Sequence, residues 1–192
     1  MPSPNAAKRR KTPARTLVLP ERLSEAIGVA LTALSLLILT SLLSYSPGDP
    51  AWYFKETIPR PTHNLIGPVG AFLAEAHFQI IGLASYLLVG LLFIAGWNRF
   101  WCRPIESLLS KVTGLTMLVI SFSGLLALAL GELPLAGQLK PAGGALGHLM
   151  ASYLVTMLNP IGGFILLVTL WFTALIVATH WSLSEGMKSF QL

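Results

Sequence analysis

Four long apolar runs, separated by polar segments, set the pattern of this chain. The first run, 26–45, is hydrophobic on every helical face, unlike the amphipathic helix of a soluble domain. Its twenty residues would form a helix of about 30 Å, the thickness of the hydrocarbon core of a bilayer. Similar runs of 19 to 21 residues cover 78–97, 112–130 and 161–181. The pattern predicts an all-α membrane protein with four transmembrane helices.

Two longer segments, 46–77 and 131–160, separate the first span from the second and the third from the fourth. Each begins with turn-forming residues and ends in a stretch rich in glycine and alanine, where small residues recur four positions apart. That spacing lets a second backbone approach closely. We therefore expect two short amphipathic helices at the membrane surface, in similar hairpins that pack pseudo-symmetrically. The small residues of these two helices could pack within the chain or join one chain to another, and the sequence leaves both roles open. They are Gly67, Gly70, Ala71, Ala74, Gly143, Gly144 and Gly147.

A distinctive turn, SYSPGDPAW over 44–52, follows the first span. Its prolines remove backbone donors, its glycine tolerates turn dihedrals, and its aspartate can cap nearby N–H groups. Tryptophan is the residue type that prefers the membrane–water interface. The pattern predicts a helix that leaves the membrane into a short, shaped turn. The residues of this turn are Ser46, Pro47, Asp49, Pro50 and Trp52.

Basic residues are distributed unevenly around the spans. With the N-terminus inside, ten of the 13 lie in 1–22, in the loop 98–111 or in the C-terminal tail, and three lie in the two longer segments. The positive-inside rule therefore predicts that both termini are cytoplasmic and that 46–77 and 131–160 are periplasmic. A fifth span over 143–158 would move the C-terminus outside, but the glycine content of this stretch favours a surface helix.

The two ends of the chain are polar. Residues 1–22 form a basic tail that we expect to be disordered and to contact anionic lipid headgroups. Nucleic-acid contact is a weaker interpretation, because no aromatic residue interleaves the basic run. That run consists of Lys8, Arg9, Arg10 and Lys11. Residues 182–192 are expected to begin a cytoplasmic linker.

Composition agrees with a membrane protein and restricts the chemistry. Hydrophobic residues make up 54% of the chain and charged residues 11%, whereas soluble domains have about 25% charged residues. The sequence has no phosphate-binding loop, no HExxH or CxxC metal motif and no GxSxG nucleophile motif. Its single cysteine excludes an internal disulfide. We predict no catalytic, cofactor-binding or metal site. We expect the four histidines to lie in loops or at the membrane interface: His63, His77, His148 and His180.

Two other classes of function stay open. A free-standing transporter or channel needs polar groups within the membrane, and the four predicted spans hold no Asp, Glu, Lys or Arg. Substrate flux in proteoliposomes would revive that interpretation. A membrane enzyme could use Glu75, His77 and His148 at the surface, although residues two positions apart do not share a helix face. Alanine replacements that leave the phenotype intact would remove it.

The first outer segment resembles the N-terminal membrane domain of the FtsK/SpoIIIE family of DNA translocases. The residues that carry this resemblance are the turn 44–52 and then Asn64, Gly67, Gly70, Ala71 and Ala74. Ser-Pro-x-Asp-Pro-x-Trp, over 46–52, is its most specific element. The family domain has four spans and a second periplasmic segment that is also glycine-rich, like GGALG here. The resemblance covers the chain from Arg15 to Trp181.

The resemblance implies a function that the residues alone do not show. Members of the family lie in the bacterial inner membrane at the division septum, and their membrane domain is a scaffold of the division machinery. A cytoplasmic motor pumps DNA as an ATP-driven hexamer, so ATP, magnesium and DNA would bind that motor. The resemblance implies that this chain anchors the translocase, helps it oligomerise and meets other division proteins. We expect a fragment that stops before the motor at Leu192, without enzymatic activity of its own.

Overall fold

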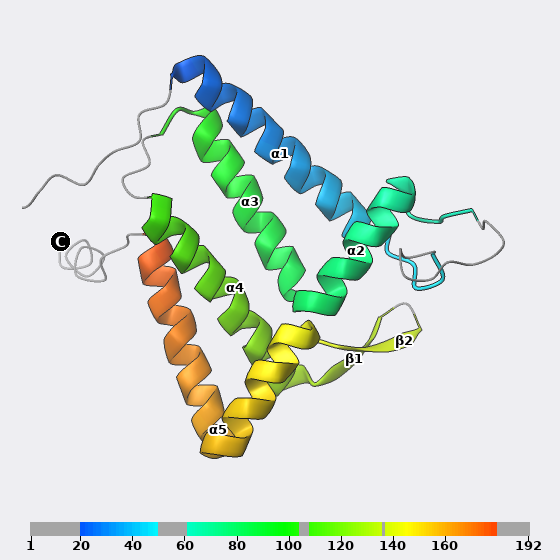
Figure 1. Cartoon of the computed structure of the whole chain (residues 1–192), viewed down its shortest axis with the longest axis vertical. Coiled ribbons are helices and arrows are strands. Elements are labelled where there is room, and N and C mark those ends of the chain that lie inside the picture. The colour runs from blue at the N-terminus through cyan, green and yellow to red at the C-terminus, as the bar shows by residue number, and fades with distance from the viewer. Residues whose placement is uncertain (1–19, 50–60, 104–107, 136, 180–192) are drawn as a thin grey trace, which may run out of the picture.

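The computed structural model describes residues 20–49, 61–103, 108–135 and 137–179. These ranges contain five helices and one two-stranded sheet (Figure 1). Their bounds are α1 (Glu21–Leu43), α2 (Gly67–Ile81), α3 (Ala84–Phe100), α4 (Leu108–Leu130), β1 (Glu132–Leu135), β2 (Gln138–Pro141) and α5 (Gly144–Thr179).

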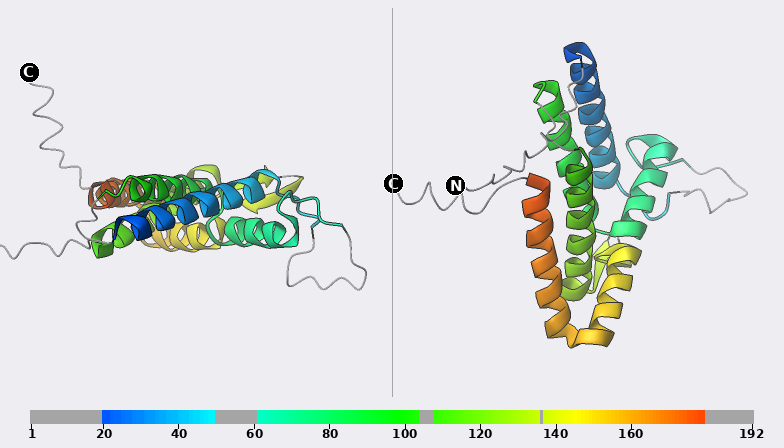
Figure 2. Two further views of the ribbon diagram at one scale, coloured as in Figure 1. Left: turned by 90° about the horizontal axis from the view of Figure 1, so that it is seen from above. Right: turned by 60° about the vertical axis from the view of Figure 1, so that its left-hand side comes forward.

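The long helices form two packed pairs, α1 with α3 and α4 with α5 (Figures 1 and 2). Glycines permit the close approach in both pairs. A Cβ atom on Gly28 of α1 would lie 2.4 Å from the backbone nitrogen of Phe100, and one on Gly114 of α4 would lie 2.7 Å from that of Ala178. Because lipid supplies no hydrophobic driving force between helices, such backbone contact is a main source of their association.

The second predicted span, 78–97, is not one continuous helix. Gly82 ends α2 with φ +60° and ψ −137°, a conformation that strongly favours glycine. The axes of α2 and α3 are bent by 112° at this point. The second long helix is therefore α3, and α2 runs across the end of the bundle (Figure 1).

A second break divides α5. Asn159 has φ +59° and ψ 167°, and Pro160 follows it without an N–H to donate. The break falls where the sequence predicts the end of the second glycine-rich helix. Residues 144–158 thus form a short helix that leads into a long one, and the two halves of α5 are drawn as a bent pair in Figure 1.

The fold is mostly helical, as predicted, but it is not all-α. Strands β1 and β2 form an antiparallel hairpin in which Glu132 pairs with Pro141 and Leu135 with Gln138. Along β1, exposed residues alternate with half-buried leucines, which is the period of a strand packed on one face. Gly137 lies in the turn with φ +86°. The hairpin occupies the first part of the segment 131–160, where turn-forming residues but no strands were expected.

Three helices of the described ranges are long and apolar enough to cross a membrane: α1, α4 and α5. The bent pair of α2 and α3 meets the same test when it is taken together, so the structure supports three or four spans. The helix ends differ from the predicted ones by a few residues: α1 ends at Leu43 rather than 45, and α4 begins at Leu108 rather than 112.

Candidate functional site

The polar contacts that distinguish this molecule gather at one end of the long helices. We call it the capped end; it comprises the loop after α1, α2, the β1–β2 hairpin and residues 144–158 of α5 (Figure 1). The opposite end, with the starts of α1 and α4 and the ends of α3 and α5, is the tail end. Two hydrogen-bond networks and two glycine contacts build the capped end.

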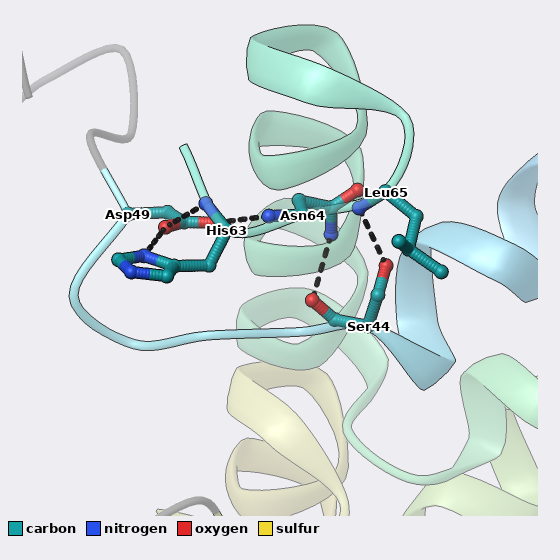
Figure 3. Close-up of polar contacts among 5 residues, drawn as sticks. All are labelled: Ser44, Asp49, His63, Asn64 and Leu65. Atoms are coloured by element: carbon teal, nitrogen blue, oxygen red, sulfur yellow. Dashed lines mark hydrogen bonds and ion pairs between the residues drawn. The ribbon is translucent and has the colours of Figure 1, made fainter. Parts of the chain in front are cut away.

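The first network is a clasp between the turn after α1 and the segment before α2 (Figure 3). The carboxylate of Asp49 accepts hydrogen bonds from the backbone nitrogens of His63, at 2.8 Å, and Asn64, at 2.9 Å. The Asp49 side chain is 2% exposed, and Nδ1 of His63 lies 3.1 Å from it. Asp49 therefore caps N–H groups, as its position in the turn suggests, but in a segment far along the chain.

Asn64 connects the same segment to the end of α1. Its side-chain nitrogen donates to the carbonyl oxygens of Ser41, at 2.9 Å, and Ser44, at 3.2 Å. The hydroxyl of Ser44 accepts a hydrogen bond from the backbone nitrogen of Leu65. The last carbonyls of a helix have no partner within it, and a buried amide satisfies two of them here. The clasp thus closes the loop onto the helix that it leaves.

Three of the small residues that the sequence selects pack against α1 and its clasp. A Cβ on Gly70 would lie 2.3 Å from Oδ1 of Asn64 and 2.9 Å from the hydroxyl of Ser41. Ala71 and Ala74 are both buried. Gly67 is different: a Cβ there would touch nothing, and its φ of +73° is what requires glycine. This face of α2 packs inside the chain.

The second network is an ion pair that the sequence did not predict. Nζ of Lys140, on β2, lies 2.7 Å from both carboxylate oxygens of Glu75, on α2. The hydroxyl of Tyr45 and the side-chain amide of Gln79 also donate to this carboxylate. The side chains of Lys140 and Glu75 are 12% and 15% exposed. The pair ties the hairpin to α2 and to the loop after α1.

Aromatic contacts hold this ion pair in place. The ring of Tyr45 lies 4.9 Å from that of Phe78, which is fully buried, and Nζ of Lys140 lies 4.8 Å from the centre of the Tyr45 ring. A cation over an aromatic face is attracted by the quadrupole of the ring. Tyr45 therefore contacts both charges of the pair.

The surroundings of Glu75 set its protonation. Burial raises the pKa of the carboxyl, but the hydrogen bonds from Lys140 and Tyr45 and the positive charge of Lys140 outweigh it. The pKa of Glu75 consequently lies below its ordinary value. The group is a carboxylate at neutral pH and holds its cation, which makes it a structural anchor and a poor proton donor.

The second glycine-rich helix packs against α4. A Cβ on Gly147 would lie 2.6 Å from the hydroxyl of Ser123, and one on Gly143 would meet the backbone of the same serine. The Ser123 hydroxyl donates to the carbonyl of Gly143. The two predicted packing surfaces thus both make contacts within the chain, and a role for them in assembly stays a prediction.

The two halves of the molecule meet where α2 ends and α5 begins. Gly144, with φ +62°, has no room for a Cβ because the backbone nitrogen of Gly82 would lie 2.5 Å from it. The nitrogen of Leu83 donates to the carbonyl of Ala142 at 2.8 Å. This crossing places Gly144 against the break between α2 and α3.

The three histidines in the described ranges each have different surroundings. His63 contacts Asp49, Nδ1 of His77 hydrogen-bonds with the carbonyl of Leu73, and His148 is exposed. Within the described ranges, no group of three or more His, Cys, Asp or Glu side chains could hold a metal ion. Glu75 pairs with Lys140 rather than with His77.

Part of the predicted site lies outside the described residues. This applies to Pro50 and Trp52 of the turn and to the basic run of the N-terminal tail, Lys8, Arg9, Arg10 and Lys11. It also applies to His180 and to the expected linker 182–192.

Comparison with known proteins assigns the family. A family model described as the 4TM region of DNA translocase FtsK/SpoIIIE matches residues 21–191. The chain belongs to this family. The match includes the clasp residues Asp49 and Asn64 and both glycine-rich helices. No solved structure matches the chain.

Curated members of the family have the same region. The chain is 30% identical over 169 residues to the DNA translocase FtsK of Pseudomonas syringae pv. syringae. The aligned region covers 84% of this chain and 21% of that protein. It is 31% identical over 168 residues to that of Pseudomonas aeruginosa, with 83% and 20% covered. The chain spans about a fifth of the length of these relatives. Family and apolar helices together indicate a multi-pass protein of the inner membrane.

Proposed function

We propose that this chain is the membrane anchor of a cell-division DNA translocase, which it holds at the septum and helps to oligomerise. The observation that carries the proposal is the clasp. The residues on which the family resemblance rests, Asp49 and Asn64, are the ones that shape the loop at the capped end. An ordered surface built from polar side chains, rather than a catalytic group, is what a docking domain needs.

The anchor has four spans, α1, α3, α4 and the second half of α5, with both termini in the cytoplasm. Charge supports this orientation. The tail end carries Arg22, Arg99, Arg103 and Lys111, whereas the described part of the capped end carries Lys140, which is paired with Glu75. An excess of Lys and Arg marks the cytoplasmic side of a membrane protein. The capped end then faces the periplasm.

A topology experiment tests this orientation. In a Cys102→Ser background, Leu139→Cys, an exposed position on β2, should react with a membrane-impermeant maleimide added to intact spheroplasts. Native Cys102, which is exposed at the tail end, should react only after the membrane is opened. The reverse labelling pattern would invert the topology and move the clasp to the cytoplasm.

The capped end is proposed to contact other division proteins, and the chain is proposed to form homo-oligomers, hexamers by resemblance. The motor that binds ATP, magnesium and DNA would lie in the part of the relatives that this chain does not span. Oligomer size follows from crosslinking in membranes followed by mass measurement. Recovery of monomers alone, from this chain and from a full-length relative, would contradict the oligomer.

Localisation tests the function itself. A fluorescent fusion to residues 1–192 should concentrate at mid-cell during division, and Asn64→Ala should reduce that concentration more than Leu149→Ala, a change at an exposed position of α5. A fusion that stays evenly spread over the envelope during division would remove the septal role. The family assignment would remain.

A further inference from the structure

An apolar cavity lies between the two helix pairs. It has a volume of about 470 Å³ and is lined by α2, α3, α4 and the start of α5. It extends along α3 from Leu88 to Ala95 and along α4 from Val112 to Ile120, which is about 10–12 Å at helical rise. Close glycine contacts hold α1 to α3 and α4 to α5, whereas the cavity lies along α3 and α4, which have fewer contacts with each other.

The lining residues give the cavity a polar end and an apolar end. Apart from His77 and Thr116, every residue that lines it is Ala, Val, Leu or Ile. His77 lies on α2, at the capped end, two positions after Glu75 of the ion pair. Its Nδ1 is engaged with the carbonyl of Leu73. The cavity therefore begins beside the polar capped end and continues between two helices of membrane-spanning composition.

We propose that this cavity binds one acyl chain of a phospholipid, with the glycerol and headgroup of that lipid beside His77. The position of the cavity supports this occupant, because acyl chains are the solvent of helices at that depth. The sequence of a polar end followed by an apolar channel matches the order of groups along a phospholipid.

The size of the cavity is compatible with one acyl chain. A volume of about 470 Å³ lies within the range of small-molecule binding sites in proteins and leaves room for a single flexible chain. The bound chain would fill the space between the two pairs and contact both.

Native mass spectrometry of the detergent-purified protein tests the proposal. The variant Ala95→Phe introduces a ring into the cavity from α3, and Ile94→Phe adds the same ring to an exposed position that does not line it. We expect wild type and Ile94→Phe to retain one phospholipid per chain after delipidation. The amount of phospholipid retained per chain should fall at least tenfold in Ala95→Phe.

Three results would overturn the proposal. One is wild-type protein without bound phospholipid, and another is equal retention by Ala95→Phe and Ile94→Phe. The third is a lower oligomer mass for Ala95→Phe with unchanged lipid, because a second copy of the chain would then occupy the cavity.

A photocrosslinking experiment on wild-type protein covers the case in which Ala95→Phe does not fold. A phospholipid with a diazirine on its acyl chain should label Leu91 and Val119, which line the cavity, more than Ile94. Equal labelling of all three residues would mean that lipid surrounds the helices without a defined site. Septal localisation is measured in a separate experiment. The lipid site and the proposed function can therefore fail independently of each other.

Discussion

The two halves of the molecule repeat one plan, and they differ at its most strained point. In each half a long helix is followed by a connection, a glycine with positive φ, a short helix, a break and another long helix. The glycine is Gly67 or Gly144, and the break fifteen positions later is Gly82 or Asn159. Both short helices begin with the pattern Gly-x-x-Gly-x-x-x-Ala.

The two breaks have nearly the same φ but different surroundings. Gly82 is pressed against the second half, where a Cβ would lie 2.2 Å from the carbonyl oxygen of Ala142. Asn159 and Pro160 are exposed. A break that contacts backbone requires glycine, whereas an exposed break can use asparagine to tolerate positive φ and proline to prevent continuation. The two breaks have nearly the same φ, and the contacts around each break determine which residue type it needs.

Exchanging the two break residues gives the largest expected effect. Gly82→Asn adds both backbone strain and a clash with Ala142, so we expect a loss of more than about 3 kcal/mol in the free energy of unfolding. Asn159→Gly removes strain, and we expect no loss or a gain of up to about 1 kcal/mol. Denaturant unfolding in detergent measures both. Equal losses at the two positions would mean that the surroundings of the break do not matter.

Gly147→Leu tests whether the glycine face of the second short helix packs inside the chain. The leucine would be forced into Ser123 of α4, and overpacking of this kind costs about 1–3 kcal/mol. Ala145→Leu, at an exposed position of the same helix, is the control and should be neutral. If Gly147→Leu keeps its unfolding free energy but loses crosslinked oligomers, the face binds another chain instead.

Asn64→Ala tests the clasp, which belongs to the first half. It leaves the carbonyls of Ser41 and Ser44 without their amide partner, so we expect a loss of about 1–3 kcal/mol and faster proteolysis of the loop after α1. In the second half the corresponding position, three before Gly144, is Pro141, which has no side-chain donor. Pro141→Ala should not accelerate cleavage of that loop. If it does so to the same extent, the clasp is not what orders the first connection.

The ion pair joins the halves, and a double-mutant cycle measures that coupling. Glu75→Gln and Lys140→Gln each leave one charge unpaired in a partly buried site, so the single changes should cost about 1–3 kcal/mol. The double variant should cost less than their sum by about 0.5–3 kcal/mol. Strict additivity would show that the two side chains do not interact in the membrane protein.

Acid should weaken the same pair with a smaller effect. Because the folded pKa of Glu75 lies below its ordinary value, the stabilisation is present above about pH 4.3 and is lost as the pH falls through the lower folded pKa. Unfolding measured between pH 6 and about pH 3 should show a loss for wild type that is smaller in Glu75→Gln. Identical profiles would exclude Glu75 as the group that titrates.

Some of this structure could be predicted from the sequence because it depends on local composition. Long uncharged runs indicate membrane helices, and the turn with Asp49 indicates a shaped connection. The break at Gly82 could not be predicted in the same way, because a single glycine in an apolar run is usually compatible with a helix. A detectable signal was the repeat of Gly-x-x-Gly-x-x-x-Ala, followed at equal distance by Gly82 and by Asn159.

The contacts between distant segments were beyond sequence reasoning. Glu75 and Lys140 are 65 positions apart, and nothing in either neighbourhood identifies the other as its partner. The hairpin of β1 and β2 was missed because four-residue strands are too short to establish an alternating pattern. Tertiary contact decided both features.

The crossing at Leu83 and Ala142 also determines how a mechanical load would travel through the membrane. A pull on the end of α5 passes along that helix and α4 to the capped end, because those two helices are packed along their length. There the Leu83–Ala142 hydrogen bond and the Glu75–Lys140 pair are among the contacts that join the two halves. Tension applied to the end of α5 would therefore also load α2 and the loop after α1.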